Sequence, residues 1–319
     1  MYAYSVPAPA VPRRRLFRIL ALCAAGAVLL CAGCTAWLLR DPVPRILDRR
    51  SQLADASSRP LEADSAHANE LVQLVATSGL EVQLMLRRPL DTVARRRPVF
   101  IILGGYRTGD RAATLIPDTH GNIVAALSYP YQGDLGVKGL AVVPAVPALR
   151  GAIMDTPAAV MLAVDYLLSR PDVDSTRVEL VGASFGTPFA TMAGALDPRV
   201  TRVWSLHGAA WPYRQIELNL RRQIPFGPAR KVVAGLATLF AAGPRFDPED
   251  WAPRIAPRPF IMINARDDER MPREGVDALY AAANQPKEII WLDGRHMQSN
   301  RREILASLVE TVLARAVKR

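Results

Sequence analysis

Cysteine is nearly absent from this chain of 319 residues, and its three copies all lie near the N-terminus, at Cys23, Cys31 and Cys34. The rest of the chain therefore has no disulfide, no thiolate nucleophile and no cysteine metal site. Histidine is almost as rare, with four copies, so a histidine base must be one of four residues. Lysine also occurs only four times, and arginine supplies the remainder of the 40 basic residues.

Acidic residues are missing before Asp41, whereas arginine occurs five times in that stretch. The whole chain has a formal net charge of +10, so these arginines account for half of it. The remaining excess is too small to indicate a nucleic-acid partner. Half of the residues are hydrophobic (50%). This composition predicts one catalytic domain of about 250 residues with an N-terminal appendage.

The N-terminal appendage contains a long run without charge. Residues 19–39 are uncharged and follow the arginine-rich segment 13–18. The run is long enough to span a bilayer and exceeds the apolar core of an ordinary signal peptide. Because arginines remain on the cytoplasmic side, we expect a transmembrane segment that exports the body, to the periplasm if the source is bacterial.

Two other interpretations of the N-terminus stay open. Residues 30–34 resemble a lipobox with Cys34 as the lipidated residue, and a cleaved signal is the third interpretation. All three export the body, and the first two tether it to the membrane. We divide the chain into a basic and transmembrane or signal segment (1–40), a polar linker (41–68) that acts as a spacer, and a catalytic domain (69–319).

Apolar segments of strand type alternate with helix-type segments through the body. The hydrophobic patterns predict strands at 70–76, 80–86, 98–103, 122–128, 178–181, 200–206, 260–264 and 288–292. They predict helices at 111–116, from Asp155, from Thr187, at 272–283 and at the C-terminus. The first two strands form an antiparallel hairpin. The alternation elsewhere predicts an α/β fold with a mostly parallel, doubly wound sheet.

Two segments interrupt the alternation. Residues 129–148 form a long loop, of a length that usually lines a site or is mobile. Residues 211–256 are rich in arginine, proline and aromatics, with an amphipathic stretch inside. We interpret them as a helical cap over the site, with a membrane-surface helix as the alternative.

The motif that carries the chemistry is Gly182-x-Ser184-x-Gly186. It lies between an apolar strand and a helix that opens at Thr187-Pro188, as in the nucleophile elbow. A turn this sharp strains the serine and leaves no space for side chains two residues away, so glycine fills both positions. The pattern predicts that Ser184 is the nucleophile.

An acid and a base follow two later strands. In a parallel sheet the carboxyl ends of the strands meet at one edge, so Ser184, Asp268 and His296 are expected to lie together. A serine hydroxyl needs a base, and the imidazole needs a carboxylate to fix its tautomer. The sequence therefore predicts His296 as the base and Asp268 as the acid.

Other histidines compete for the role of base. His207 also follows a strand and can reach the same edge, but it precedes the acid in chain order. His67 in the linker and His120 in a loop are expected to be solvated. We therefore favour His296 and keep His207 as the alternative.

The choice of acid rests on spacing. Asp268 stands four residues before Pro272, as in the D-x-x-V-P loop of hydrolases. Asp267 remains an alternative, and Asp293 lies too close to His296 along the chain to be favoured.

The oxyanion of an acyl-transfer reaction needs fixed backbone donors. We expect one from the N–H of Phe185, directly after the nucleophile. The second is expected from the N–H of Tyr106, in the glycine-rich turn that begins at Gly104.

Together these segments resemble an α/β-hydrolase of the dienelactone hydrolase and prolyl oligopeptidase-like kind. The resemblance covers residues 70–316 and rests on segments 102–106, 170–178, 182–186, 268–272 and 294–296. It implies acyl hydrolysis through a serine acyl-enzyme, with no cofactor or metal. Gly104 departs from the histidine that lipases and esterases carry there, and the chain is too short for the propeller of the oligopeptidases.

The leading hypothesis is therefore a membrane-tethered serine hydrolase that acts on a small acyl ester outside the cytoplasm. A non-catalytic binding protein on the same scaffold is the second hypothesis. A peptidase or thioesterase with the same triad is the third. The sequence leaves the oligomeric state open.

Overall fold

The computed structural model describes residues 13–90, 95–134 and 139–317. The chain divides into two units, Met1–Arg40 and Asp41–Arg319. In the first unit, α1 (Arg13–Leu38) contains the segment Leu20–Leu38, which has a mean hydropathy of 2.0 and is not buried. By length and composition this segment can cross a membrane. A second stretch of this kind, Ala141–Ser169, is mostly buried in the other unit, as a core helix is.

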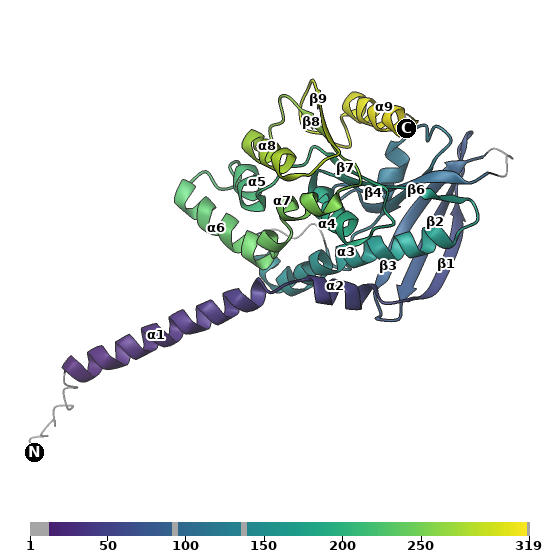
Figure 1. Cartoon of the computed structure of the whole chain (residues 1–319). Coiled ribbons are helices and arrows are strands. Elements are labelled where there is room, and N and C mark those ends of the chain that lie inside the picture. The colour runs from purple at the N-terminus through teal and green to yellow at the C-terminus, as the bar shows by residue number, and fades with distance from the viewer. Residues whose placement is uncertain (1–12, 91–94, 135–138, 318–319) are drawn as a thin grey trace, which may run out of the picture. The chain divides into compact units, whose positions relative to one another are not determined.

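The second unit is built on a nine-stranded sheet with the order β1-β2-β3-β5-β4-β6-β7-β8-β9 (Figure 1). The strands are β1 (Leu53–Leu61), β2 (His67–Ala76), β3 (Glu81–Pro89), β4 (Arg97–Leu103), β5 (Ile123–Leu127), β6 (Val173–Ala183), β7 (Arg202–Leu206), β8 (Phe260–Ala265) and β9 (Lys287–Leu292). From β5 to β9 all pairs are parallel, whereas β1, β2, β3 and β5 pair antiparallel. The predicted hairpin and mostly parallel sheet are confirmed.

Helices cover both faces of this sheet. In the described part of the second unit the helices are α2 (Val43–Arg50), α3 (Val146–Ser169), α4 (Thr187–Leu196), α5 (Pro212–Asn219), α6 (Gly227–Phe240), α7 (Pro248–Trp251), α8 (Arg273–Ala282) and α9 (Arg302–Val317). Short 3₁₀ helices are η1 (Gly109–Leu115), η2 (Gly139–Ala145), η3 (Ser184–Gly186), η4 (Gly243–Arg245) and η5 (Ala252–Ile255). The helix expected at 111–116 is thus a 3₁₀ helix.

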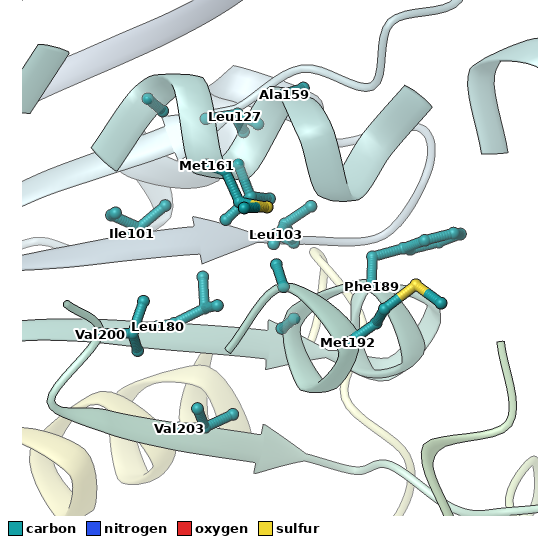
Figure 2. Packing of buried hydrophobic residues seen from close by; sticks show 14 of the residues in the cluster. Ile101, Leu103, Leu127, Ala159, Met161, Leu180, Phe189, Met192, Val200 and Val203 are labelled. Atoms are coloured by element: carbon teal, nitrogen blue, oxygen red, sulfur yellow. The ribbon is translucent and has the colours of Figure 1, made fainter. Parts of the chain in front are cut away.

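The larger core lies between the sheet and helices α3 and α4. Figure 2 shows Ile101, Leu180 and Val203 from three strands together with Met161 of α3 and Met192 of α4. Each fully buried aliphatic side chain of this size contributes about 1.5–3 kcal/mol relative to exposure. On the opposite face, α9 covers the alternate residues of the central strands. This double cover explains why the central strands are almost continuously apolar.

The segment expected to be a spacer, residues 41–68, is folded. It carries α2 and β1 and the first residues of β2, all within the second unit. The prediction missed them because β1 is an edge strand with almost no buried side chain, so it shows no hydrophobic alternation. Only Ile46 of α2 is fully buried, and ion pairs from Arg45 and Arg49 to Asp155 hold the helix to the body.

The helix expected to open at Asp155 begins earlier, at Val146. Asp155 therefore does not cap it. Pro157 lies inside the helix, and the true first turn contains Pro147, where the missing N–H removes no bond within the helix. Much of the predicted loop 129–148 is accordingly helical, in η2 and the start of α3. Its residues 135–138 lie outside the described part.

The segment 211–256 is helical, as predicted. It contains α5, α6 and α7 with two 3₁₀ turns. Residues of α5 line the same cleft as Ser184. The expected cap therefore contributes to the wall of the site, while Val232, Leu236 and Phe240 of α6 are exposed.

Candidate active site

The elbow places Ser184 at the carboxyl end of β6. The strand ends at Ala183, η3 turns the chain, and α4 begins at Thr187. Ser184 has φ +53°, in the left-handed region that residues other than glycine rarely adopt. The predicted strained turn is therefore present, and it lifts the serine side chain out of the sheet.

Gly182 shows why this turn excludes side chains. A Cβ at position 182 would lie 2.7 Å from the Cβ of Ala190 and 2.8 Å from the Cα of Thr187. Both distances are shorter than non-bonded carbon atoms allow. The first glycine of the motif thus lets α4 pack directly on the strand that carries it.

A continuous chain of hydrogen bonds joins the three residues predicted as catalytic. Ser184 Oγ lies 2.9 Å from His296 Nε2. His296 Nδ1 lies 2.8 Å from Oδ2 and 3.0 Å from Oδ1 of Asp268. Asp268 follows β8 and His296 follows β9, so the sheet brings together groups far apart in the sequence.

Asp268 is held as an ionised carboxylate. Its Oδ1 accepts hydrogen bonds from the N–H groups of Arg270 (2.9 Å) and Met271 (3.0 Å). Burial opposes ionisation, but hydrogen bonds from His207 and His296 outweigh it and hold the pKa of Asp268 well below its usual range. An ionised acid here can orient His296 and stabilise its imidazolium form.

His207, the alternative base, contacts the acid and not the serine. It follows β7, its side chain is fully buried, and its Nδ1 lies 3.0 Å from Asp268 Oδ2. The rings of His207 and His296 meet edge to face, with centroids 5.3 Å apart. Asp268 therefore lies between two histidines, which the sequence reasoning did not foresee.

Glu269 is a second residue that the sequence reasoning missed. Its Oε2 accepts the backbone N–H of His296 at 2.9 Å, and its Oε1 lies 3.0 Å from Arg301. Burial would raise the pKa of Glu269, yet the His296 N–H and Arg301 lower it to about 2. Its position next to Asp268 was the only signal in the sequence.

The other two aspartates considered as the acid do not reach His296. Asp267 is exposed, and its backbone N–H donates to the carbonyl of Gly294 at 3.1 Å. Asp293 has a 95% exposed side chain that pairs with Arg266. The geometry thus brings Asp268 alone of the three to the imidazole.

The expectation of a solvated His67 is wrong. Its side chain is only 4% exposed, and its Nδ1 lies 3.2 Å from Asp64 Oδ1 and 3.1 Å from an Arg87 nitrogen. Asp64 also pairs with Arg87, so this cluster ties the start of β2 to β3. His120 has a 55% exposed side chain, as expected.

The two turns expected to supply oxyanion donors lie close together. The rings of Tyr106 and Phe185 are 5.8 Å apart, and both residues line the cleft of Ser184. The hydroxyl of Tyr129 donates to the carbonyl of Gly104 at 2.6 Å, which fixes the first turn. Burial raises the pKa of Tyr129, so the hydroxyl keeps its proton for this bond.

A cleft of about 1380 Å³ surrounds Ser184 and His296. Its walls include the turn at Gly104–Arg107, residues of α5 and the loop that carries His296. A space of this size admits a small-molecule ester.

His207, Asp268 and His296 could also bring ligand atoms to a metal ion, because these atoms lie within 4.8 Å of one another. The contacts from Asp268 to the two rings are 2.8–3.0 Å, the length of ordinary N–H···O hydrogen bonds. His296 also uses its second nitrogen toward Ser184. The donor set therefore fits a proton relay better than a metal centre.

Several solved structures share this fold. Acetyl xylan esterase 1 from Thermoanaerobacterium sp. JW/SL YS485 is 20% identical, with a TM-score of 0.59 over 86% of this chain and 94% of that one. The acetyl xylan esterase from Paenibacillus sp. R4 is 19% identical, with a TM-score of 0.59 over 84% and 91%. The chain has the α/β-hydrolase fold. This confirms the resemblance seen in the sequence.

The likeness extends to 2,6-dihydroxy-pseudo-oxynicotine hydrolase, at 21% identity and a TM-score of 0.54 over 76% of this chain and 67% of that one. At these identities the α/β-hydrolase fold is what the comparisons establish. No protein-family model matches the chain, and no curated protein matches its sequence.

Proposed function

We propose that this α/β-hydrolase is a serine hydrolase that cleaves carboxylic esters through an acyl-enzyme. The observation that carries the proposal is the unbroken chain from Ser184 through His296 to Asp268, with heavy-atom distances of 2.8–3.0 Å. The esterases among the structural neighbours support it.

The first half-reaction follows from this geometry. The hydroxyl of Ser184 donates its proton to His296 Nε2 as its Oγ attacks the ester carbonyl. Asp268 accepts the Nδ1–H of His296 and stabilises the imidazolium that forms. The backbone N–H groups of Phe185 and Tyr106 stabilise the oxyanion. The tetrahedral intermediate then collapses, and His296 returns the proton to the departing alcohol.

The second half-reaction repeats these roles with water. His296 takes a proton from a water molecule, and the resulting hydroxide attacks the acyl-enzyme carbonyl. When the ester bond to Ser184 breaks, His296 returns the proton to Oγ and the carboxylic acid leaves. No cofactor is needed for either step.

We also propose that the N-terminal segment tethers the catalytic unit outside the cytoplasm. Support comes from α1, whose segment Leu20–Leu38 is long and apolar enough to span a bilayer. The arginines before it favour a cytoplasmic N-terminus.

A fluorophosphonate probe tests the proposed chemistry. We expect the wild-type protein to be labelled and to hydrolyse p-nitrophenyl acetate, with or without EDTA. Ser184→Ala is expected to abolish labelling, and His296→Ala to slow it strongly. Labelling that persists in Ser184→Ala would exclude this serine as the nucleophile. Wild-type protein that ignores both reagents would favour a non-catalytic binding protein, and a panel of matched esters, thioesters and peptides separates the reaction classes.

A further inference from the structure

The cleft of Ser184 is lined by five arginines and, among the residues that the structure describes, a single carboxylate, that of Glu269. Arg295 and Arg301 place nitrogens 3.4 and 3.0 Å from the same Glu269 Oε1. One carboxylate is thus divided between two cations. This wall of the cleft therefore keeps a net positive charge.

The other three arginines are exposed and reach the cleft from different sides. Arg107 follows Tyr106, Arg222 lies in the turn after α5, and Arg270 is two residues beyond Asp268. Within the described part of the chain, none of the three has an ion pair with a carboxylate. Three uncompensated charges therefore surround the mouth of the site.

We propose that the substrates are esters whose non-reacting part carries a carboxylate that these arginines hold. The inference rests on the ester hydrolysis proposed above. A guanidinium binds a carboxylate through two parallel hydrogen bonds, which fixes orientation as well as position. Converging positive charges also raise the rate at which an anion enters a cleft, an effect that salt weakens. A neutral ester gains neither benefit.

Two acetate esters of similar size test this charge preference. They are 4-acetoxybenzoate, which is anionic, and 4-acetoxybenzamide, which is neutral, each corrected for its uncatalysed hydrolysis. We expect kcat/KM to favour the anionic ester by about 10-fold at low ionic strength. The ratio should fall toward 1 at about 0.5 M salt, where charges are screened within a few ångströms.

Charge-removing variants locate the effect. In the double variant Arg222→Gln, Arg270→Gln the ratio is expected to fall several-fold. In Arg59→Gln, on the exposed edge strand β1, it should stay at the wild-type value. A ratio near or below 1 with Ser184-dependent turnover of both esters would overturn the charge preference and leave the hydrolase proposal standing. No turnover of either ester would overturn both.

A second inference starts from His207, whose side chain has no exposed surface. Its backbone is held in the left-handed region, at φ +49°, and its N–H donates to the carbonyl of Ile263 at 2.7 Å. Its Nδ1 lies 3.0 Å from Asp268 Oδ2 and 3.3 Å from the N–H of Met297. His207 therefore touches both the loop that carries the acid and the loop that carries the base.

The surroundings determine where the proton of His207 lies. Its Nε2 is buried and has no hydrogen-bond partner within the described residues. A proton on Nε2 would leave a buried N–H unsatisfied and turn the Nδ1 lone pair toward a carboxylate. The proton therefore belongs on Nδ1, where it is donated to Asp268. A protonated Nδ1 cannot accept a hydrogen bond, so the longer contact with the N–H of Met297 is not one.

We infer that His207 is a positioning residue that fixes the Asp268 carboxylate for His296. By donating to Oδ2, it removes one direction in which the carboxylate could rotate and draws charge away from the oxygen nearest His296 Nδ1. Loss of the donor would let the carboxylate stabilise the imidazolium form of His296 more strongly. The base would then become free only at higher pH. The groups that face His296 are Ser184, Asp268, His207, Glu269 and Arg301.

Two substitutions at this position separate positioning from packing. His207→Phe keeps a ring and removes the donor. His207→Asn places an amide N–H near the site of Nδ1, and asparagine tolerates a left-handed backbone. We expect His207→Phe to lower kcat about 10-fold and to move the acid limb of the kcat/KM profile up by about 0.5–1 pH unit. In His207→Asn, kcat and the position of the acid limb should both lie close to their wild-type values.

The matched control is His120→Phe, because His120 is exposed and has nearly the same backbone angle, φ +48°. Its pH profile should be that of the wild type. An unchanged acid limb in His207→Phe would contradict the positioning role. If His207→Phe does not fold, His207→Asn alone tests the proposal. A shift of about 0.5–1 pH unit in its acid limb, although a donor is present, would also contradict the positioning role.

Discussion

The α-carbon of Gly186 lies against the backbone carbonyl of Leu103, so closely that a Cβ at position 186 would overlap the carbonyl oxygen. Leu103 ends β4, and its partner in the parallel pairing with β6 is Gly182. The nucleophile turn therefore leaves the sheet beside the end of β4, where the Gly104–Tyr106 turn begins. The second glycine of the motif brings the two expected oxyanion donors to the same place.

Replacement of this glycine should damage the fold as well as the site. We expect Gly186→Ala to lower the free energy of unfolding by about 1–3 kcal/mol, because the new Cβ would overlap the backbone of Leu103, which no side-chain rotation can move away. The matched control is Gly235→Ala, in α6, where a Cβ meets no atom within 4 Å. That change should leave stability equal or raise it by up to about 1 kcal/mol. Urea unfolding measures both, and an unaffected Gly186→Ala protein would refute the close packing.

Asparagine substitutions should show which of the adjacent residues Asp267 and Asp268 is the catalytic acid. Asp268→Asn keeps the side-chain shape but favours the wrong imidazole tautomer, so kcat is expected to fall by about 10³–10⁴-fold. Asp267→Asn, one residue away and exposed, should stay within about 2-fold of the wild type. Steady-state hydrolysis of p-nitrophenyl acetate gives both values. A larger loss in Asp267→Asn would reverse the assignment.

Glu269 should give a stability contribution that depends on pH. Its pKa is lowered from 4.5 to about 2 in the folded protein. The unfolded state therefore takes up the proton first, and the contribution is complete above about pH 5 and disappears as pH falls toward 2. Because the side chain is partly solvated, we expect about 1 kcal/mol. Urea unfolding of wild type and Glu269→Gln should differ by this amount at pH 7 and converge near pH 2.

The control for this titration is Glu310→Gln, on the exposed face of α9. It should match the wild type at both pH values. A difference between wild type and Glu269→Gln that is as large at pH 2 as at pH 7 would show that the carboxylate charge is not what stabilises the fold.

The sequence predicted the parts of this molecule that follow strong local signals. Ser184 is marked by glycines, and Asp268 and His296 stand at the ends of apolar strands that a parallel sheet brings to one edge. The strand–helix alternation likewise predicted the sheet, because central strands buried on both faces are continuously apolar.

The parts that the sequence did not predict depend on contacts between distant residues. β1 is recognisable only through its backbone pairing with β2, since its side chains are mostly exposed. His67 is buried against Arg87 of the neighbouring strand β3, together with Asp64 from the turn before β2, and its own surroundings in the sequence are polar. The contact of His207 with Asp268 joins residues 61 positions apart. No pattern within one segment contains such information.

The N-terminal segment carries the last prediction, which separates the three interpretations of membrane attachment. Leu20–Leu38 has 19 residues, which at 1.5 Å per residue span about 28 Å, close to the hydrocarbon thickness of a bilayer. We therefore expect the full chain, expressed in a bacterium, to resist carbonate extraction from membranes and to keep its N-terminus by intact mass. Cys34→Ser should behave identically, because a spanning helix does not need lipidation. Release of Cys34→Ser into the soluble fraction would instead show a lipoprotein. A soluble wild-type protein that has lost residues before the body would show a cleaved signal.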